Sequence, residues 1–139
     1  MSRVIRRPMD GADRYLAPVF RDNAATFVSG VEEIAQAHPQ EAAHMTAIAM
    51  ELALKSRLLA SGVSDDWNRR HLRHDLTKAL RCARQAGLIE PPAGMAAVAA
   101  LFTPYYANHE FGRFPSSLFT AADWRHAAGL VRAVIGGPS

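Results

Sequence analysis

The sequence predicts an all-α domain, an antiparallel up-and-down bundle of four to five helices. Apolar residues recur every three or four positions along most of the chain, and no segment alternates with a period of two. Strand-like runs of Val, Ile, Thr and aromatic residues are absent, whereas alanine is abundant, which favours helices. The length of 139 residues fits one domain, and helices with short connections pack as antiparallel neighbours.

The first half of the chain contains two expected helices. We expect the first from Arg14 to Ala37, because the residue before Pro39 avoids the helical region. The second is expected from Gln40 to Ser61, with Gly62 as its C-cap. A flexible basic N-terminal arm, residues 1–11, is expected to precede the helical domain, residues 12–135.

Three further segments complete the predicted bundle. Ser64 and the two aspartates after it can cap residues 66–87, which form either one helix or two joined near His74. Pro91-Pro92 opens the next helix, in which Thr103-Pro104 predicts a kink or a fresh start. Residues 111–117 read as a loop. Thr120 and Asp123 resemble a capping box for a last helix ending near Ile135, before a disordered tail, residues 136–139.

Composition narrows the protein class. Apolar residues are 49% of the chain, too many for a disordered protein. The single cysteine, Cys82, excludes an internal disulfide and is consistent with a reducing compartment. No apolar stretch approaches the ~20 residues that span a bilayer, and no hydrophobic run follows the basic N-terminus. We therefore expect a cytoplasmic protein without membrane contact.

The helix expected at residues 40–61 carries charges on its apolar face. At about 100° per residue, His44, Glu51 and Lys55 lie within about 20° of the middle of that face. Burying Glu51 and Lys55 costs several kcal/mol of desolvation for each charge. Removing one partner of such a pair commonly destabilises the protein by ~3–5 kcal/mol. Two interpretations follow: the pair ties helices or subunits into register, or it belongs to a polar site.

A basic segment follows this helix. Six of the sixteen Lys and Arg residues fall between positions 69 and 84, with His71 and His74 among them and Asp75 as the one acid. They are Arg69, Arg70, Arg73, Lys78, Arg81 and Arg84. This basic face suits a phosphate-binding surface, and it equally suits a solvated helix face.

Several kinds of site find no support in the sequence. The His71 and His74 pair lacks the cysteines or glutamate of a zinc motif, no glycine-rich phosphate loop occurs, and Ser116-Ser117 lacks a nucleophile-elbow context. We expect no metal and no cofactor. A helix-turn-helix DNA-binding motif is conceivable around Gly62, but it would give the buried Glu51–Lys55 pair no role.

Three motifs resemble one known family. Residues 49–59, with Glu51-Leu52-Ala53-Leu54-Lys55, resemble the E-L-x-L-K-A helix of HEPN (higher eukaryotes and prokaryotes nucleotide-binding) domains. His74-Asp75-Leu76 and residues 83–88 resemble the H-D-L and A-x-x-x-G-L that follow there. Arg113-Phe114-Pro115, after Tyr105-Tyr106, is similar to the family's R-Y-P, with phenylalanine replacing tyrosine. The resemblance covers about residues 14–135.

The resemblance implies a helical bundle, commonly a homodimer, with a polar cleft near the dimer interface. Five side chains would then converge as one charged cluster: Glu51, Lys55, His74, Asp75 and Arg113. The leading hypothesis is a dimer that binds a nucleotide or an RNA phosphate through Lys55, His74, Arg113 and the basic face. It would act beside a nucleotidyltransferase or an antitoxin-like partner.

Two alternatives stay open. Many HEPN proteins are metal-independent ribonucleases that use an arginine and a histidine separated by four to six residues, and Arg69 and His74 have four residues between them. In that chemistry the histidine acts on the 2′-hydroxyl or the leaving group, and the arginine stabilises phosphorane charge. The family usually has Asn, Asp or His after the arginine, where this chain has Arg70. The second alternative is a non-catalytic dimeric scaffold.

Overall fold

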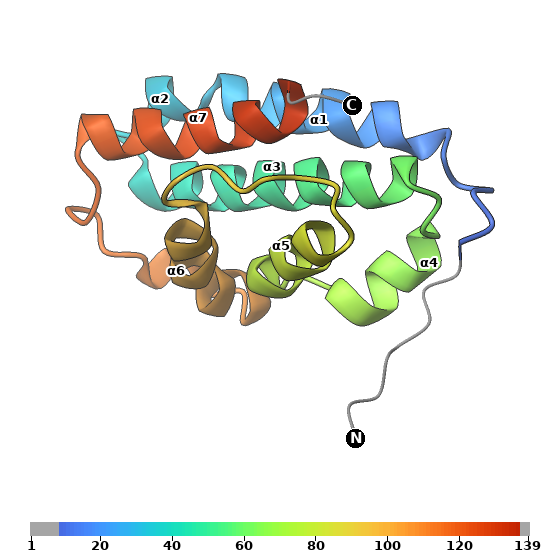
Figure 1. Ribbon diagram of the computed structural model, residues 1–139. Helices are drawn as coiled ribbons and strands as arrows, with labels where there is room; N and C mark the ends of the chain where they lie inside the picture. Colours follow the sequence, from blue (N-terminus) through green and yellow to red (C-terminus); the bar gives the residue numbers. More distant parts are fainter. Residues whose placement is uncertain (1–8, 137–139) are drawn as a thin grey trace.

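The computed structural model describes residues 9–136, and every regular element in that range is a helix (Figure 1). The predicted all-α class is confirmed. Most of the predicted arm and tail lies outside the described residues. The backbone N–H of Gly11 donates to the carbonyl of Gly62 at 3.1 Å, and Gly136 closes the last helix. No helix within residues 9–136 is both long and apolar enough to cross a membrane.

The helix α3 (Pro39–Ala60) is the axis of the fold. Pro39 occupies its first turn, where proline needs no amide hydrogen. At its other end Gly62 has φ +107°, and the next N–H returns to Leu58, so a glycine cap ends the helix as predicted. α3 contacts α1, α2, α5, α6 and α7, and its apolar residues, among them Met50 and Leu54, are fully buried.

Two helices and a short third one cover one side of α3. The predicted helix at Arg14 to Ala37 is divided into α1 (Leu16–Ser29) and α2 (Val31–Ile34), because Gly30, a poor helix former, separates them. α7 (Ala121–Gly136) begins at the predicted capping box, in which Thr120 and Asp123 exchange hydrogen bonds of 2.8 and 3.2 Å. α1 runs antiparallel to α3, whereas α7 runs in the same direction as α3 (Figure 1).

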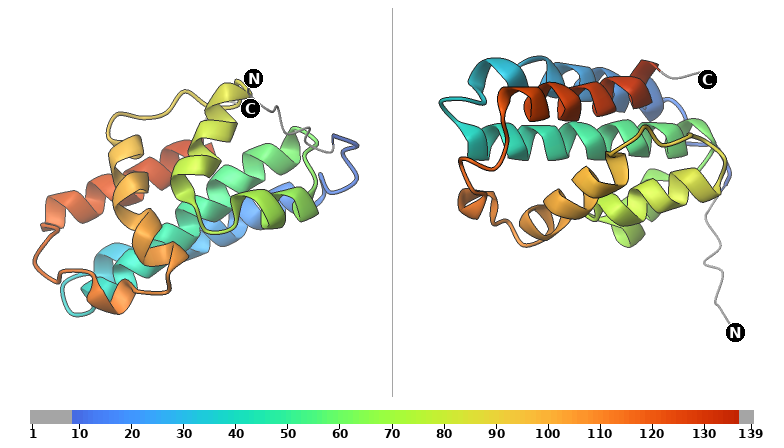
Figure 2. Two further views of the ribbon diagram at one scale, coloured as in Figure 1. Left: turned by 90° about the horizontal axis from the view of Figure 1, so that it is seen from below. Right: turned by 60° about the vertical axis from the view of Figure 1, so that its left-hand side comes forward.

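The other side of α3 is covered by the middle of the chain. Residues 66–87 are divided near His74, one of the two predicted alternatives: α4 (Asp65–Trp67) continues into the π-helix η1 (Asn68–Leu72), and α5 (Leu76–Gln85) follows. α5 and α6 (Met95–Ala107) cross α3 obliquely (Figure 2). The up-and-down arrangement therefore holds for α1 and α3, and the HEPN-like arrangement of the whole bundle stays a prediction.

Pro104 neither ends nor restarts α6, which continues from Met95 to Ala107. The hydroxyl of Thr103 instead accepts hydrogen bonds from the backbone N–H groups of Leu76 at 3.2 Å and Thr77 at 3.4 Å. Thr103 thus caps the first turn of α5, a different helix from the one for which the sequence predicts it. This contact ties α6 to the start of α5.

An aromatic cluster fixes the loop after α6. Phe102, Phe111, Phe114, Phe119 and Trp124 form ring contacts with centroid distances between 4.8 and 6.2 Å. The side chain of Phe114 is buried, and its carbonyl accepts a 3.0 Å hydrogen bond from Gln40. The loop around the short helix η2 (Phe111–Arg113) is therefore held against α3, with the phenylalanine ring in the core.

Candidate functional site

Glu51 lies at the centre of a buried polar cluster on α3. Only 8% of its surface is exposed, which confirms that α3 directs this carboxylate inward. One oxygen, Oε1, is 3.6 Å from Lys55 Nζ, and the other, Oε2, is 2.8 Å from His74 Nδ1. Tyr106 also hydrogen-bonds to this carboxylate. Three partners thus compensate for the desolvation of the negative charge.

The pKa of Tyr106 reports the same environment. Burial of the ring raises the pKa of its hydroxyl well above the usual value for tyrosine. The negative charge of Glu51 and the hydrogen bond to it raise the pKa further. Tyr106 therefore stays a neutral hydrogen-bond donor to Glu51 throughout the physiological pH range.

Lys55 is buried one turn further along α3, with 6% of its surface exposed. Its ammonium group donates to the backbone carbonyl of Arg73 at 3.0 Å, closer than its 3.6 Å approach to Glu51. The sequence predicts the Glu51–Lys55 pair from the spacing of four residues, and the pair is formed. The contact with Arg73 comes from a segment beyond the end of α3.

A tight turn from Leu72 to Asp75 carries His74 to Glu51. The N–H of Asp75 donates to the carbonyl of Leu72 at 3.0 Å, and Arg73 between them has φ +48° and ψ −126°. These values define a type II′ β-turn, with Arg73 in the position that glycine usually occupies. Asp75 then caps α5 by accepting from the N–H of Lys78 at 2.9 Å.

Aromatic rings and two further histidines surround His74. Its imidazole stacks on Tyr106 with ring centroids 4.4 Å apart, and His109 lies edge-on at 6.1 Å. His44 stacks on Phe111 at 5.1 Å and meets Tyr106 edge-on at 5.8 Å. His44 is exposed, so the sequence-based placement of this residue in the middle of the buried face is wrong.

The pKa of His44 is lowered from its ordinary value. Partial burial against the rings is the largest cause, and the positive charges of His109 and His74 lower it further. A positive charge on His109 or His74 therefore disfavours protonation of His44.

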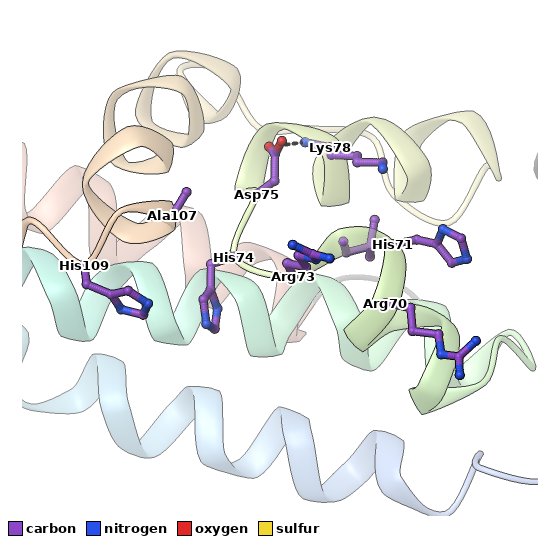
Figure 3. Close-up of a pocket in the computed structure, with 9 residues that line it drawn as sticks. Arg70, His71, Arg73, His74, Asp75, Lys78, Ala107 and His109 are labelled. Carbon is purple, nitrogen blue, oxygen red and sulfur yellow. Dashed lines mark hydrogen bonds between the residues drawn. The ribbon is translucent and has the colours of Figure 1, made fainter.

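The first of two hollows beside the cluster is basic. It has a volume of about 620 Å³ and is lined by six basic residues, Arg70, His71, Arg73, His74, Lys78 and His109, with Asp75 as the one acid. Figure 3 shows the segments that carry these side chains, which are η1, the turn, α5 and the residues just after α6. We call this the basic hollow. Asp75 accepts a hydrogen bond from the backbone N–H of Lys78, so its carboxylate is engaged as the cap of α5.

The second hollow has a mixed lining and a volume of about 540 Å³. Its walls are Phe20, Leu52, Glu51, Lys55, Asp65, Arg69, Arg73 and His74, and we call it the mixed hollow. Arg73 and His74 line both hollows, so the turn lies between them. Arg69 is largely exposed and forms ion pairs with Asp65 at 3.6 Å and Asp66 at 3.5 Å.

The structure brings together only some of the predicted site residues. Glu51, Lys55 and His74 meet, and Asp75 is adjacent as the cap of α5. Arg113 lies exposed at the end of η2 and lines neither hollow. Arg81 and Arg84 are exposed on α5, also outside both hollows.

Sequence analysis did not assign Tyr106 or His109 to the site. Tyr106 follows Tyr105 in one quoted motif, and His109 lies four residues after Tyr105, two residues beyond the end of α6. Nothing in their spacing places them beside His74, because α6 reaches the turn through tertiary packing. His109 has φ +55°, a left-handed conformation that is uncommon for residues other than glycine, so the sequence does not predict it.

Comparison with protein-family models, with curated protein sequences and with solved structures finds no match to this chain. The HEPN resemblance therefore stays a prediction from the quoted motifs. Within residues 9–136, no group of three or more His, Cys, Asp or Glu side chains is arranged to hold a metal ion.

Proposed function

We propose that this domain binds a phosphate group of a nucleotide or of RNA in the basic hollow. The observation that carries the proposal is the lining: six basic residues surround a space of about 620 Å³ with a single acid among them. Arginine offers planar paired donors, lysine a point charge, and histidine ring N–H groups, all suited to phosphate oxygens. The HEPN resemblance supports the same ligand class.

The structure changes which residues are proposed to contact the phosphate. Lys55 is engaged by Glu51 and by the Arg73 carbonyl, and Arg113 lies away from the hollow. We therefore assign the phosphate to Arg70, Arg73 and Lys78, with histidine N–H groups beside them. Lys55 contacts the backbone of Arg73 and Glu51 contacts the side chain of His74, so both residues hold the turn that lines this site.

A matched pair of double variants tests the proposal. Arg70→Gln/Lys78→Gln removes two positive charges that line the basic hollow, and Arg81→Gln/Arg84→Gln removes two exposed charges outside it. Titration of a short single-stranded RNA at increasing salt measures affinity and its salt dependence. The first variant should lose affinity and reduce the slope of log K against log salt by roughly 1.4, since each lost phosphate contact contributes about 0.7.

The second variant should keep most of the affinity and slope of the wild-type protein. Equal losses in both variants would show diffuse attraction to the basic surface and would contradict a phosphate site in the hollow. Absence of binding by the wild-type protein at low salt, for RNA and for nucleotides, would favour the scaffold alternative.

Metal-independent RNA cleavage is a second candidate function, favoured by the mixed hollow. Arg69 and His74 line it together, and Glu51 occupies Nδ1 of His74, which leaves Nε2 for proton transfer. Wild type, His74→Ala and Arg69→Ala are compared for cleavage with a chelator present, with Arg84→Ala, an exposed arginine outside both hollows, as the control. Loss in the first two variants at unchanged melting temperature supports cleavage, and no cleavage by the wild type across varied RNAs excludes it.

The homodimer, the nucleotidyltransferase or antitoxin-like partner, and the cytoplasmic location stay predictions. Sedimentation of the purified chain tests the dimer directly. A monomer at micromolar concentration that still binds RNA would separate phosphate binding from dimerisation.

A further inference from the structure

The buried Lys55 has two partners, and the closer one is not the carboxylate. Its Nζ atom is 3.0 Å from the Arg73 carbonyl oxygen and 3.6 Å from Glu51 Oε1. The ion pair with Glu51 therefore explains only part of the position of the Lys55 ammonium group. The remaining contact is with the backbone of the turn that both hollows share.

The Arg73 carbonyl belongs to the central peptide of the type II′ turn. The turn's own hydrogen bond joins Asp75 N–H to Leu72 O, so the central carbonyl has no partner within the turn. Arg73 bears a side chain at φ +48°, in a region that glycine adopts readily and other residues rarely adopt. A charge-assisted hydrogen bond from Lys55 stabilises this orientation of the peptide.

One face of α3 thus holds two consecutive residues of the turn in different ways. Lys55 binds the backbone of Arg73, and Glu51 binds the side chain of His74 at 2.8 Å. Reorienting the central peptide would move the Arg73 side chain out of the position between the hollows. It would also change the direction from which His74 approaches Glu51.

We propose that Lys55 is a positioning residue, which holds the Arg73–His74 turn in its type II′ form and thereby completes both hollows. This inference rests on the proposed function for its biological meaning, because Arg73 is one of the assigned phosphate ligands. Lys55 acts through Arg73 and His74 and does not contact the phosphate.

The test separates this role from simple neutralisation of Glu51. Lys55→Met removes the donor, and Glu51→Gln/Lys55→Met also removes the negative charge of Glu51, which would otherwise have lost its Lys55 partner. Amide hydrogen exchange at Asp75 reports the turn, and the ¹⁵N spectrum of the His74 ring reports its Nδ1–H contact with residue 51. Exchange at Val98 is the control for global stability; its N–H lies in α6 and donates to the carbonyl of Gly94, the residue before that helix.

Both variants should speed exchange at Asp75 at least tenfold relative to Val98 and should weaken the Nδ1–H signature of His74. Adding Arg73→Gly to the neutral double variant should restore slow exchange at Asp75, because glycine adopts this conformation without Lys55. If the neutral double variant keeps the wild-type turn, or if Arg73→Gly fails to restore it, the positioning role is wrong.

Failure of the inference and failure of the proposed function give different results. The exchange and ring measurements need no ligand, so they stand even if wild-type protein binds no RNA. If the turn responds as expected, RNA affinity should fall in Lys55→Met although its charge lies outside the set of proposed phosphate contacts. An unchanged turn in a protein that binds RNA contradicts the inference alone.

Discussion

Nδ1 of His74 lies 2.8 Å from Oε2 of Glu51, which joins the turn before α5 to the middle of α3. A carboxylate only accepts hydrogen bonds, so the imidazole donates through Nδ1 and keeps Nε2 available. Tyr106 stacks on the same imidazole and donates to the same carboxylate. The buried polar cluster therefore draws its side chains from α3, from the turn and from α6. Substitutions in each of these segments test it.

The buried pair on α3 should dominate the stability of this region. Glu51→Gln leaves the Lys55 ammonium buried without a counter-charge, and we expect a loss of about 3–5 kcal/mol in the free energy of unfolding. Urea denaturation measures it, with Arg70→Gln as the exposed control. Arg70 pairs with Asp66 at 3.2 Å on the surface, so that change should cost less than about 1 kcal/mol.

The neutral double variant Glu51→Gln/Lys55→Met should be more stable than Glu51→Gln, since no buried charge is left unpaired. Equal effects of Glu51→Gln and Arg70→Gln would show that Glu51 is solvated in solution.

The cap supplied by Thr103 should matter for α5 and not for α6. Thr103→Val keeps the shape of the side chain but removes the acceptor for the N–H groups of Leu76 and Thr77. The expected loss is about 1 kcal/mol in the free energy of unfolding, the usual value for a helix cap. Faster amide exchange at Leu76 should accompany it.

Thr26→Val is the matched control, because the hydroxyl of Thr26 is exposed and bonds only to Asp22 of its own helix. Its effect should stay within about 0.5 kcal/mol. If Thr103→Val slows or spares exchange at Leu76, the inter-helix cap is not formed in solution.

The lowered pKa of His44 predicts a pH dependence of stability. The folded state binds the proton of His44 more weakly than the unfolded state, whose pKa is near the ordinary value of 6.5. Unfolding therefore takes up a proton below that pH, and the contribution of His44 to stability is lost as pH falls through 6.5. Denaturation at about pH 7.5 and at about pH 5.5 should show this loss in the wild type and a smaller one in His44→Gln.

His126→Gln provides the control, since His126 bonds to the Ala93 carbonyl away from this cluster. A pH response that His44→Gln leaves unchanged would assign the effect to other groups.

Gly94 should be intolerant of a side chain. Its φ is +88°, and a Cβ atom there would lie 2.6 Å from the ring of His126 on α7. Gly94→Ala should destabilise the protein by about 1–3 kcal/mol, mainly through backbone strain at this positive φ, and it should also displace the exposed His126 ring. Gly129→Ala within α7 meets no atom within 4 Å and should instead stabilise it by about 0.5–1 kcal/mol.

Melting temperature ranks these two glycine variants directly. A Gly94→Ala protein as stable as Gly129→Ala would show that the segment before α6 can rearrange.

Local sequence patterns predicted the parts of the fold that depend on neighbours in the chain. The spacing of four residues placed Glu51 and Lys55 together, the Thr120–Asp123 capping box opened α7, and Gly62 ended α3. Each of these features requires only contacts within one or two turns of helix. The same kind of pattern would have paired Arg69 with Asp65 and Asp66 at spacings of four and three.

The site depends on contacts that no local pattern specifies. Thr103 carries the signature of a cap for its own helix but caps α5, because α6 packs beside the start of α5. Arg73 adopts a turn conformation for which the sequence offers no glycine. Its carbonyl is stabilised by Lys55, 18 residues earlier in the chain. Because the turn depends on such long-range hydrogen bonds, the sequence of the basic segment alone could not predict the basic hollow.

The central claim, a phosphate site in the basic hollow, is tested most directly by an NMR titration with adenosine monophosphate, using adenosine as the phosphate-free control. The ring signals of His71, His74 and His109 and the amide of Lys78 should shift saturably with the monophosphate at low salt. Adenosine should leave them in place. Shifts equal for both compounds, absent altogether, or gathered around Arg113, Arg81 and Arg84 would contradict the account.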